Sequence, residues 1–196
     1  MVKGYHAIWS CYGFWLPNDA RGSWSNEVWA KHLRPFGEAT KTSIRRSLAD
    51  APHDARARRE AKTHLLYPAV RFTGIQARAV GRGFGKILPV LGVKALACAI
   101  MPDHVHVVID RHPHLLIEEI VAHLKRAATR QMTREDIHPL RDYHRNTGRV
   151  PQPWVEGGWF RYLNDDQAIA DAVDYVRQNP TKIGLPIQTW SFVAAT

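Results

Sequence analysis

Apolar and polar residues follow two different spacings along this chain, and these spacings predict strands and helices. Short stretches rich in apolar and aromatic residues indicate four strands, at 5–14, 93–101, 104–110 and 154–163. Apolar residues at helical spacing indicate three helices, one from 74 until Gly92 ends it, one at 114–132 and one at 165–179. Within the first of these helices, Gly83 and Gly85 predict close packing against a neighbouring element.

The stretch 26–70 interrupts this order and is predicted to be an inserted helical segment. Pro52 divides its basic part, 43–64, into two short helices, because proline disfavours a helical residue before it. Without the insertion the order is βαββαβ followed by a helix, which is the ferredoxin-like pattern of an α+β fold. We therefore expect one domain over 1–196, an antiparallel sheet with helices on one face, and the other face free for a site.

Two histidines occupy alternate positions on the predicted strand 104–110, which follows a tight turn at Pro102 and Asp103. Because side chains alternate between the two faces of a strand, His104 and His106 point the same way. Two imidazoles are part of a ligand set for a divalent ion, which needs at least a third protein ligand or several waters. The same alternation occurs on half-buried strands that bind nothing, so the pair alone leaves both interpretations open.

A tyrosine and an asparagine on the last predicted helix add a second kind of chemistry. Tyr175 and Asn179 are separated by one helical turn and share a face, whereas Val173 and Val176 face elsewhere. A tyrosine hydroxyl that reaches a phosphate is a nucleophile once it is activated, and an asparagine can add a neutral oxygen ligand. A packing tyrosine and a capping asparagine are the other interpretation.

The charge of the chain favours nucleic acid as a partner. Lys and Arg total 27 against 18 Asp and Glu, which gives a net charge of +9. The planar fork of arginine matches phosphate oxygens, although an ordinary basic surface has the same composition. Cys11 and Cys98 fit no metal-ligand spacing, and the longest apolar run, 95–101, is far below the ~20 residues of a membrane span. We therefore expect a reduced cytoplasmic, nucleoid-associated protein with no membrane partner.

Several of these motifs together resemble a known family. The segment MPDHVH at 101–106, with YVRQNP at 175–180, resembles the single-tyrosine HUH transposases of bacterial insertion sequences. The resemblance is closest to the REP-associated tyrosine transposases, and WLPNDARG at 15–22, GWF at 158–160 and WS at 190–191 extend it. It covers most of the chain, with 26–70 the least matched.

The resemblance implies a site and a reaction. His104 and His106 would bind Mg²⁺ or Mn²⁺, with Asn179 as the third protein ligand. Better-known members have glutamine as that ligand, and here Gln178 stands one residue early. Tyr175 would attack a phosphate of single-stranded DNA and form a 5′-phosphotyrosine link with release of a 3′-OH. No ATP is needed, because the link stores the cleaved bond.

The family's substrates are folded single strands, typically imperfect hairpins, so the resemblance also implies a DNA-binding surface. Basic side chains would follow the backbone while aromatic rings stack on unpaired bases. The candidates are Arg21, Trp24, Lys125, Arg126 and Arg130. For the tryptophans at the ends of 15–24, pinning the loop to the body of the protein is the alternative role. The protein would act as a monomer or a homodimer.

Three other functions fit parts of the sequence. A histidine-triad nucleotide hydrolase needs a third histidine where Val108 stands. A non-catalytic nucleic-acid-binding module on a ferredoxin-like sheet carries aromatic residues on its central strands, and 104–110 has none. A transposase that has lost cleavage but still binds DNA would have a similar sequence, although here the motif residues are intact.

Overall fold

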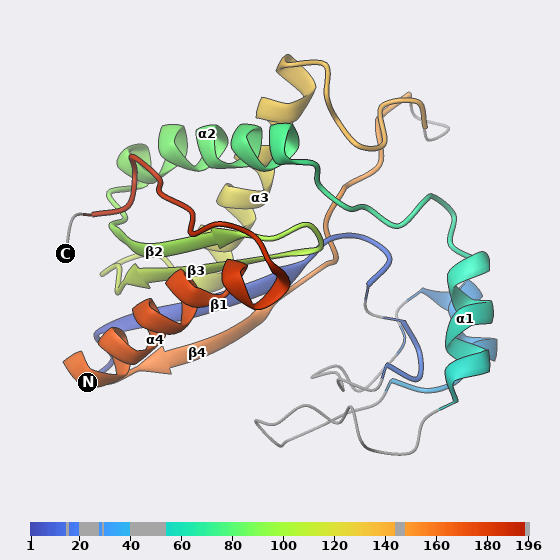
Figure 1. Cartoon of the computed structure of the whole chain (residues 1–196), viewed down its shortest axis with the longest axis horizontal. Coiled ribbons are helices and arrows are strands. Elements are labelled where there is room, and N and C mark those ends of the chain that lie inside the picture. The colour runs from blue at the N-terminus through green and yellow to red at the C-terminus, as the bar shows by residue number, and fades with distance from the viewer. Residues whose placement is uncertain (15, 20–27, 29, 40–53, 144–147, 195–196) are drawn as a thin grey trace. The chain divides into compact units, whose positions relative to one another are not determined.

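The chain divides into two units in the computed structural model, which describes all residues except 15, 20–27, 29, 40–53, 144–147 and 195–196 (Figure 1). One unit joins Met1–Cys11 to Arg71–Thr196, and the other is Tyr12–Val70. The expected insertion, 26–70, lies within the second unit, and the single domain expected over 1–196 stays a prediction. None of the helices in the described ranges has the length and apolar character that a membrane crossing requires.

The first unit is an antiparallel sheet of four strands with helices packed on it. Its elements are β1 (Gly4–Ser10), α2 (Gly74–Leu91), β2 (Ala95–Ile100), β3 (His104–Asp110), α3 (Ile117–Arg134), β4 (Trp159–Leu163), α4 (Asp166–Gln178) and the short 3₁₀ helix η2 (Pro180–Ile183). The strand order in the sheet is β2-β3-β1-β4. Alternation of strands and helices in this order is the ferredoxin-like arrangement, so the predicted fold class is confirmed.

Helices lie on both faces of the sheet. Trp9 of β1 meets Phe84 of α2 with ring centroids 6.0 Å apart, so this face is covered by α2 and the α3 helix packed beside it. On the opposite face, small and branched residues of α4 form a buried cluster with β2, β3 and β4, as Figure 1 shows from the position of α4. The two histidines of the predicted site project from this second face, as expected, and α4 covers part of it because its apolar stripe is buried by packing there.

Helix α2 is defined by its ends and by one close contact. Thr73 and Gln76 form a capping box at its start. Gly92 ends the helix in the left-handed conformation, with φ 66°. A Cβ added at Gly83 would lie 2.8 Å from the carbonyl oxygen of Ala127 and 2.9 Å from Cα of Ala128. The backbones of α2 and α3 thus approach each other where glycine predicted close packing.

The first and last strands are shorter than the sequence indicates. β1 ends at Ser10 rather than at 14, and β4 begins at Trp159 rather than at 154. Between these ends, Trp154 and Cys11 form only a single bridge. Trp154 is buried in the core although it lies outside β4, because burial of an aromatic ring does not require strand pairing, whereas Tyr12 and Phe14 beyond β1 are only partly buried.

Helix α3 begins at Ile117 rather than at 114. A turn precedes it, in which Nδ1 of His112 accepts hydrogen bonds from the backbone N–H groups of His114 and Leu115. Glu119 then accepts from the backbone N–H of Leu116 and closes the first helical turn. The side chains of His112 and Glu119 therefore determine where the helix starts.

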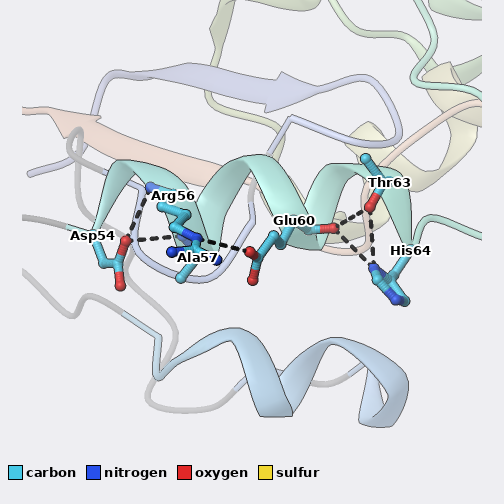
Figure 2. A network of polar contacts seen from close by, with 6 residues as sticks. All are labelled: Asp54, Arg56, Ala57, Glu60, Thr63 and His64. Carbon is cyan, nitrogen blue, oxygen red and sulfur yellow. Dashed lines mark hydrogen bonds and ion pairs between the residues drawn. The ribbon is translucent and has the colours of Figure 1, made fainter.

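The second unit contains the 3₁₀ helix η1 (Lys31–Phe36) and α1 (Ala55–Thr63). Asp54 caps α1 by accepting from the backbone N–H groups of Arg56 and Ala57, at 2.9 and 2.8 Å. Figure 2 shows this cap and the polar contacts along the helix, made by Asp54, Arg56, Ala57, Glu60, Thr63 and His64. Of the two short helices expected over 43–64, α1 corresponds to the second, and the first falls outside the described residues.

Candidate active site

The turn between β2 and β3 holds the first histidine of the pair. The backbone N–H of Phe72 donates to the carbonyl of Pro102, and that of Cys11 donates to the carbonyl of Asp103, both at 2.7 Å. The carboxylate of Asp103 lies 2.7 Å from Nδ1 of His104. Because an ionised carboxylate can only accept, Nδ1 of His104 carries the hydrogen, and Nε2 keeps a lone pair for a ligand.

The second histidine is held by a residue that sequence reasoning missed. Nδ1 of His106 lies 3.0 Å from Nε2 of His6 on β1, and the two rings stack with centroids 5.3 Å apart. Both side chains are buried, each about 4% exposed. The signal for His6 is strand pairing: Ile8 pairs with His106, so His6, two residues earlier, projects from the same face as both histidines of the pair.

Burial keeps both contacting imidazoles neutral. Loss of solvation, together with the positive charge of Arg161, lowers the pKa of His6 to about 4. Burial, followed by the charges of His104, His6 and Lys182, lowers the pKa of His106 well below its ordinary value. A histidine must be neutral to bind a metal ion, so this environment suits a ligand at pH 7.

Tyr175 of α4 lies beside these histidines. Its ring centroid is 5.8 Å from that of His106 and 5.9 Å from that of His6. The side chain is 46% exposed, whereas Val173 and Val176 are buried in the core. Nζ of Lys182 lies over the ring, 3.9 Å from its centroid. The tyrosine is thus at the edge of the histidine cluster and accessible, which a purely packing residue would not be.

Asn179 follows one turn later, and the direction of α4 shows which way it lies. Ile169, near the start of α4, lies close to Gly4 of β1, which pairs with Asp110 at the last residue of β3, and the ring of Tyr175 lies near that of His106. The helix axis therefore runs toward the first residue of β3, and Asn179 lies on that path, ~6 Å beyond Tyr175 at 1.5 Å per residue. Asn179 is 7% exposed, and its side chain makes no capping bond to η2.

The donor set near the pair is compatible with a divalent ion. Nε2 of His104 and Nε2 of His106 are the nitrogens that the two Nδ1 contacts leave available. Within the part of the chain that the structure describes, no three His, Cys, Asp or Glu side chains form a group that could hold a metal. A third ligand would therefore come from other chemistry, and the amide oxygen of the buried Asn179 and water both suit Mg²⁺ or Mn²⁺.

The predicted DNA-binding residues are not gathered at this site. Arg21 and Trp24 lie outside the described residues. Arg126 and Arg130 are exposed on α3, on the sheet face opposite α4, so the structure does not bring them to Tyr175 (Figure 1). Their contact with DNA stays a prediction.

Lys125 makes hydrogen bonds to the backbone of its own chain. Its ammonium donates to the carbonyl of Val155 at 2.8 Å and to that of Gly157. Burial lowers its pKa to about 8, with the nearby Glu156 carboxylate acting in the opposite direction. Two of its three donors therefore hold the segment before β4, which leaves little of the ammonium for a phosphate.

Two residues of the edge strand β4 lie next to the histidine cluster. Trp159 meets His6 edge to face, with ring centroids 5.9 Å apart. Arg161 pairs with His6 across the β1–β4 ladder. An aromatic ring and an arginine thus lie next to His6, on an element from which no DNA-binding residue was predicted.

Comparison with known proteins gives matches to transposases. Residues 69–157 match the IS200-like transposase family, a stretch that includes His104 and His106 and ends before Tyr175. A Haemophilus influenzae protein named as a REP-associated tyrosine transposase is 28% identical over 96 residues, which are 46% of this chain and 51% of that protein. The chain thus spans about half the length of this curated relative.

A solved structure shares the fold. It is a REP-associated tyrosine transposase bound to a REP hairpin, and it matches with a TM-score of 0.51 and 11% sequence identity. The match covers 97% of this chain and 74% of that one. At this identity the likeness concerns the arrangement of the elements.

Proposed function

We propose that this chain, whose residues 69–157 match the IS200-like transposase family, cleaves and rejoins single-stranded DNA with Tyr175 as the nucleophile. One observation carries the proposal: a half-exposed tyrosine ring lies 5.8 Å from the ring of His106. Phosphoryl transfer to a tyrosine uses a nucleophile, imidazole nitrogens available to bind an ion, and access for the substrate from solvent.

The metal would be held by residues of two elements. Nε2 of His104 and of His106 would bind Mg²⁺ or Mn²⁺ from β3, and the amide oxygen of Asn179 would bind it from the end of α4. When bound, a divalent ion supplies charge that polarises a phosphate oxygen and stabilises the leaving oxygen. Asp103 fixes the orientation of the His104 ring through its 2.7 Å contact.

The reaction that these residues serve is a transesterification. The hydroxyl oxygen of Tyr175 forms a bond to phosphorus, and the bond from phosphorus to the 3′ oxygen of the preceding nucleotide breaks. The tyrosine hydroxyl loses its proton and the released 3′ oxygen gains one, so the products are a 5′-phosphotyrosine and a 3′-OH. Attack of a 3′-OH on that link reverses the step. Lys182, above the ring, lies where it can balance the charge of the phosphate.

The substrate is single-stranded DNA that folds into a hairpin. The net charge of +9 suits a polyanion, and the structurally similar protein is described as bound to a REP hairpin. Trp159 and Arg161 beside the histidine cluster are of the residue types that contact unpaired nucleotides. We extend this substrate class to the present chain as part of the proposal.

A covalent adduct tests the nucleophile. A hairpin oligonucleotide labelled at its 3′ end is incubated with the full chain and Mn²⁺, and a denaturing gel separates free DNA from protein-linked DNA. A 5′-phosphotyrosine link carries the 3′ label onto the protein, and Tyr175→Phe should abolish that band. Tyr162→Phe is the matched control, because Tyr162 is also exposed (53%) and its ring contacts Tyr5 on the other face of the sheet.

Two outcomes would refute the proposal. Persistence of the adduct in Tyr175→Phe would assign the nucleophile to another residue. Binding of the hairpin without any adduct, in the presence of either ion, would indicate a protein that binds DNA without cleaving it.

A further inference from the structure

His6 touches three parts of the histidine cluster from one buried position. Its Nε2 lies 3.0 Å from Nδ1 of His106, and its ring contacts those of Tyr175 and Trp159 at centroid distances of 5.9 Å. The side chain is only 4% exposed. It is therefore in contact with a proposed ligand and with the proposed nucleophile, but it has little access to a substrate.

The contact between the two imidazole nitrogens has two possible directions. If Nδ1–H of His106 donates, then Nε2 of His106 keeps its lone pair. If Nε2–H of His6 donates instead, His106 must carry its own hydrogen on Nε2 and has no nitrogen left for an ion. Nε2 of His104 is available because the carboxylate of Asp103 accepts from Nδ1. For one ion to be bound by both histidines, as the proposed function requires, His106 must also keep Nε2 free and so donate through Nδ1–H. In both His104 and His106, Nε2 then keeps the lone pair that can bind an ion.

We infer that His6 is a positioning residue for the proposed reaction: its Nε2 accepts Nδ1–H of His106 and thereby holds Nε2 of His106 as a metal-ligating lone pair. This inference rests on the proposed function. The same ring packs against Tyr175, so His6 sets the ligand and the nucleophile relative to each other. The Nδ1–H groups of the two proposed ligands donate to different acceptors, an anionic carboxylate for His104 and a neutral imidazole for His106.

The test begins with the metal-free wild-type chain labelled with ¹⁵N in its histidines. Long-range ¹H–¹⁵N correlation spectra report which ring nitrogen carries hydrogen, and we expect Nδ1 for both His104 and His106. Protonation of His106 at Nε2 in this spectrum would overturn the inference without any variant.

Two substitutions then separate the hydrogen bond from packing. His6→Phe keeps a ring but removes the acceptor, and it should mix the tautomers of His106 and weaken Mn²⁺ binding by about 10–100-fold in calorimetry. His6→Gln offers an amide oxygen as acceptor and should retain most of the affinity. His114→Phe, at an exposed histidine of the same unit, should change neither measurement.

The outcomes distinguish this inference from the proposed function. Unchanged tautomer and unchanged Mn²⁺ affinity in a folded His6→Phe would refute the role of His6 even if the wild type forms an adduct. Absence of an adduct in the wild type would refute the proposed function, while the wild-type spectrum still decides the direction of the hydrogen bond. If His6→Phe fails to fold, the wild-type spectrum and His6→Gln decide the question.

Discussion

The contact between α2 and α3 at Gly83 allows a quantitative prediction for a single methyl group. In Gly83→Ala the added Cβ would meet the main chain of α3 at 2.8–2.9 Å, whereas a Cβ at Gly85 would first meet Phe192 at 3.4 Å. The carbonyl of Ala127 and Cα of Ala128 cannot turn away as a flexible side chain can, so the helices must separate by several tenths of an ångström. Gly85→Ala is therefore the matched control on the same helix.

The magnitudes follow from two opposing effects. Replacement of glycine by alanine inside a helix stabilises by up to about 1 kcal/mol, and overpacking of a well-packed contact costs about 1–3 kcal/mol. Since the clash at Gly83 is with backbone, its cost lies toward the upper end, and we expect Gly83→Ala to destabilise by about 1–2 kcal/mol. Gly85→Ala should be neutral or stabilise by up to about 1 kcal/mol.

Urea denaturation followed by far-UV circular dichroism measures both variants against the wild type. With an unchanged slope in the usual range of ~1–3 kcal/mol per M, the midpoint of Gly83→Ala should fall by about 1 M. If its midpoint equals or exceeds that of Gly85→Ala, then the close approach of the two backbones is not the constraint that we infer.

Three further predictions concern ionisable and buried groups. The pKa of His6 lies at about 4 in the folded chain against 6.5 when exposed. Stability that is present above pH 6.5 should therefore be lost as the pH falls toward 4, and the loss should be about 2 kcal/mol at pH 5. Denaturation midpoints at pH 7.5 and 5, compared between wild type and His6→Gln, check this. Lys125→Met removes a donor from two loop carbonyls and should cost about 1–3 kcal/mol, and equal midpoints for this variant and the wild type would contradict it. Cys11 and Cys98 are buried, and burial raises the pKa of both thiols, so a thiol reagent should react with them only after urea is added.

The strand that carries the histidines could be predicted with its correct ends. Apolar and polar residues alternate over 104–107, the apolar run continues to Ile109, and Pro102 and Asp103 mark the turn before the strand, so the pattern and the turn chemistry agree. The extents of β1 and β4 could not be predicted in the same way. Trp154 looks like a strand residue, but the tertiary core buries it outside the ladder.

Part of the candidate site could also be predicted from the sequence, and part could not. That His104 and His106 share a face follows from strand geometry alone, and that Tyr175 and Asn179 share a face follows from helix geometry. The position of His6 depends on which residue of β1 pairs with which residue of β3, and that register is a tertiary property. A lone histidine in an aromatic stretch gives no local signal of a partner a hundred residues away.

The sheet order has a consequence for how the molecule opens. β3 is hydrogen bonded on both sides, by β1 and by β2, whereas α4 is held to the sheet by side-chain packing and by an exposed ion pair between Lys3 and Asp166. Amide hydrogens of β3 should therefore exchange with solvent only through global unfolding, and those of α4 through a smaller, local opening. A molecule in the locally opened state keeps both histidines in register and has its tyrosine displaced. Under the proposed function, such a state would keep the two histidine ligands of β3 but displace both Tyr175 and Asn179, so it would not cut DNA.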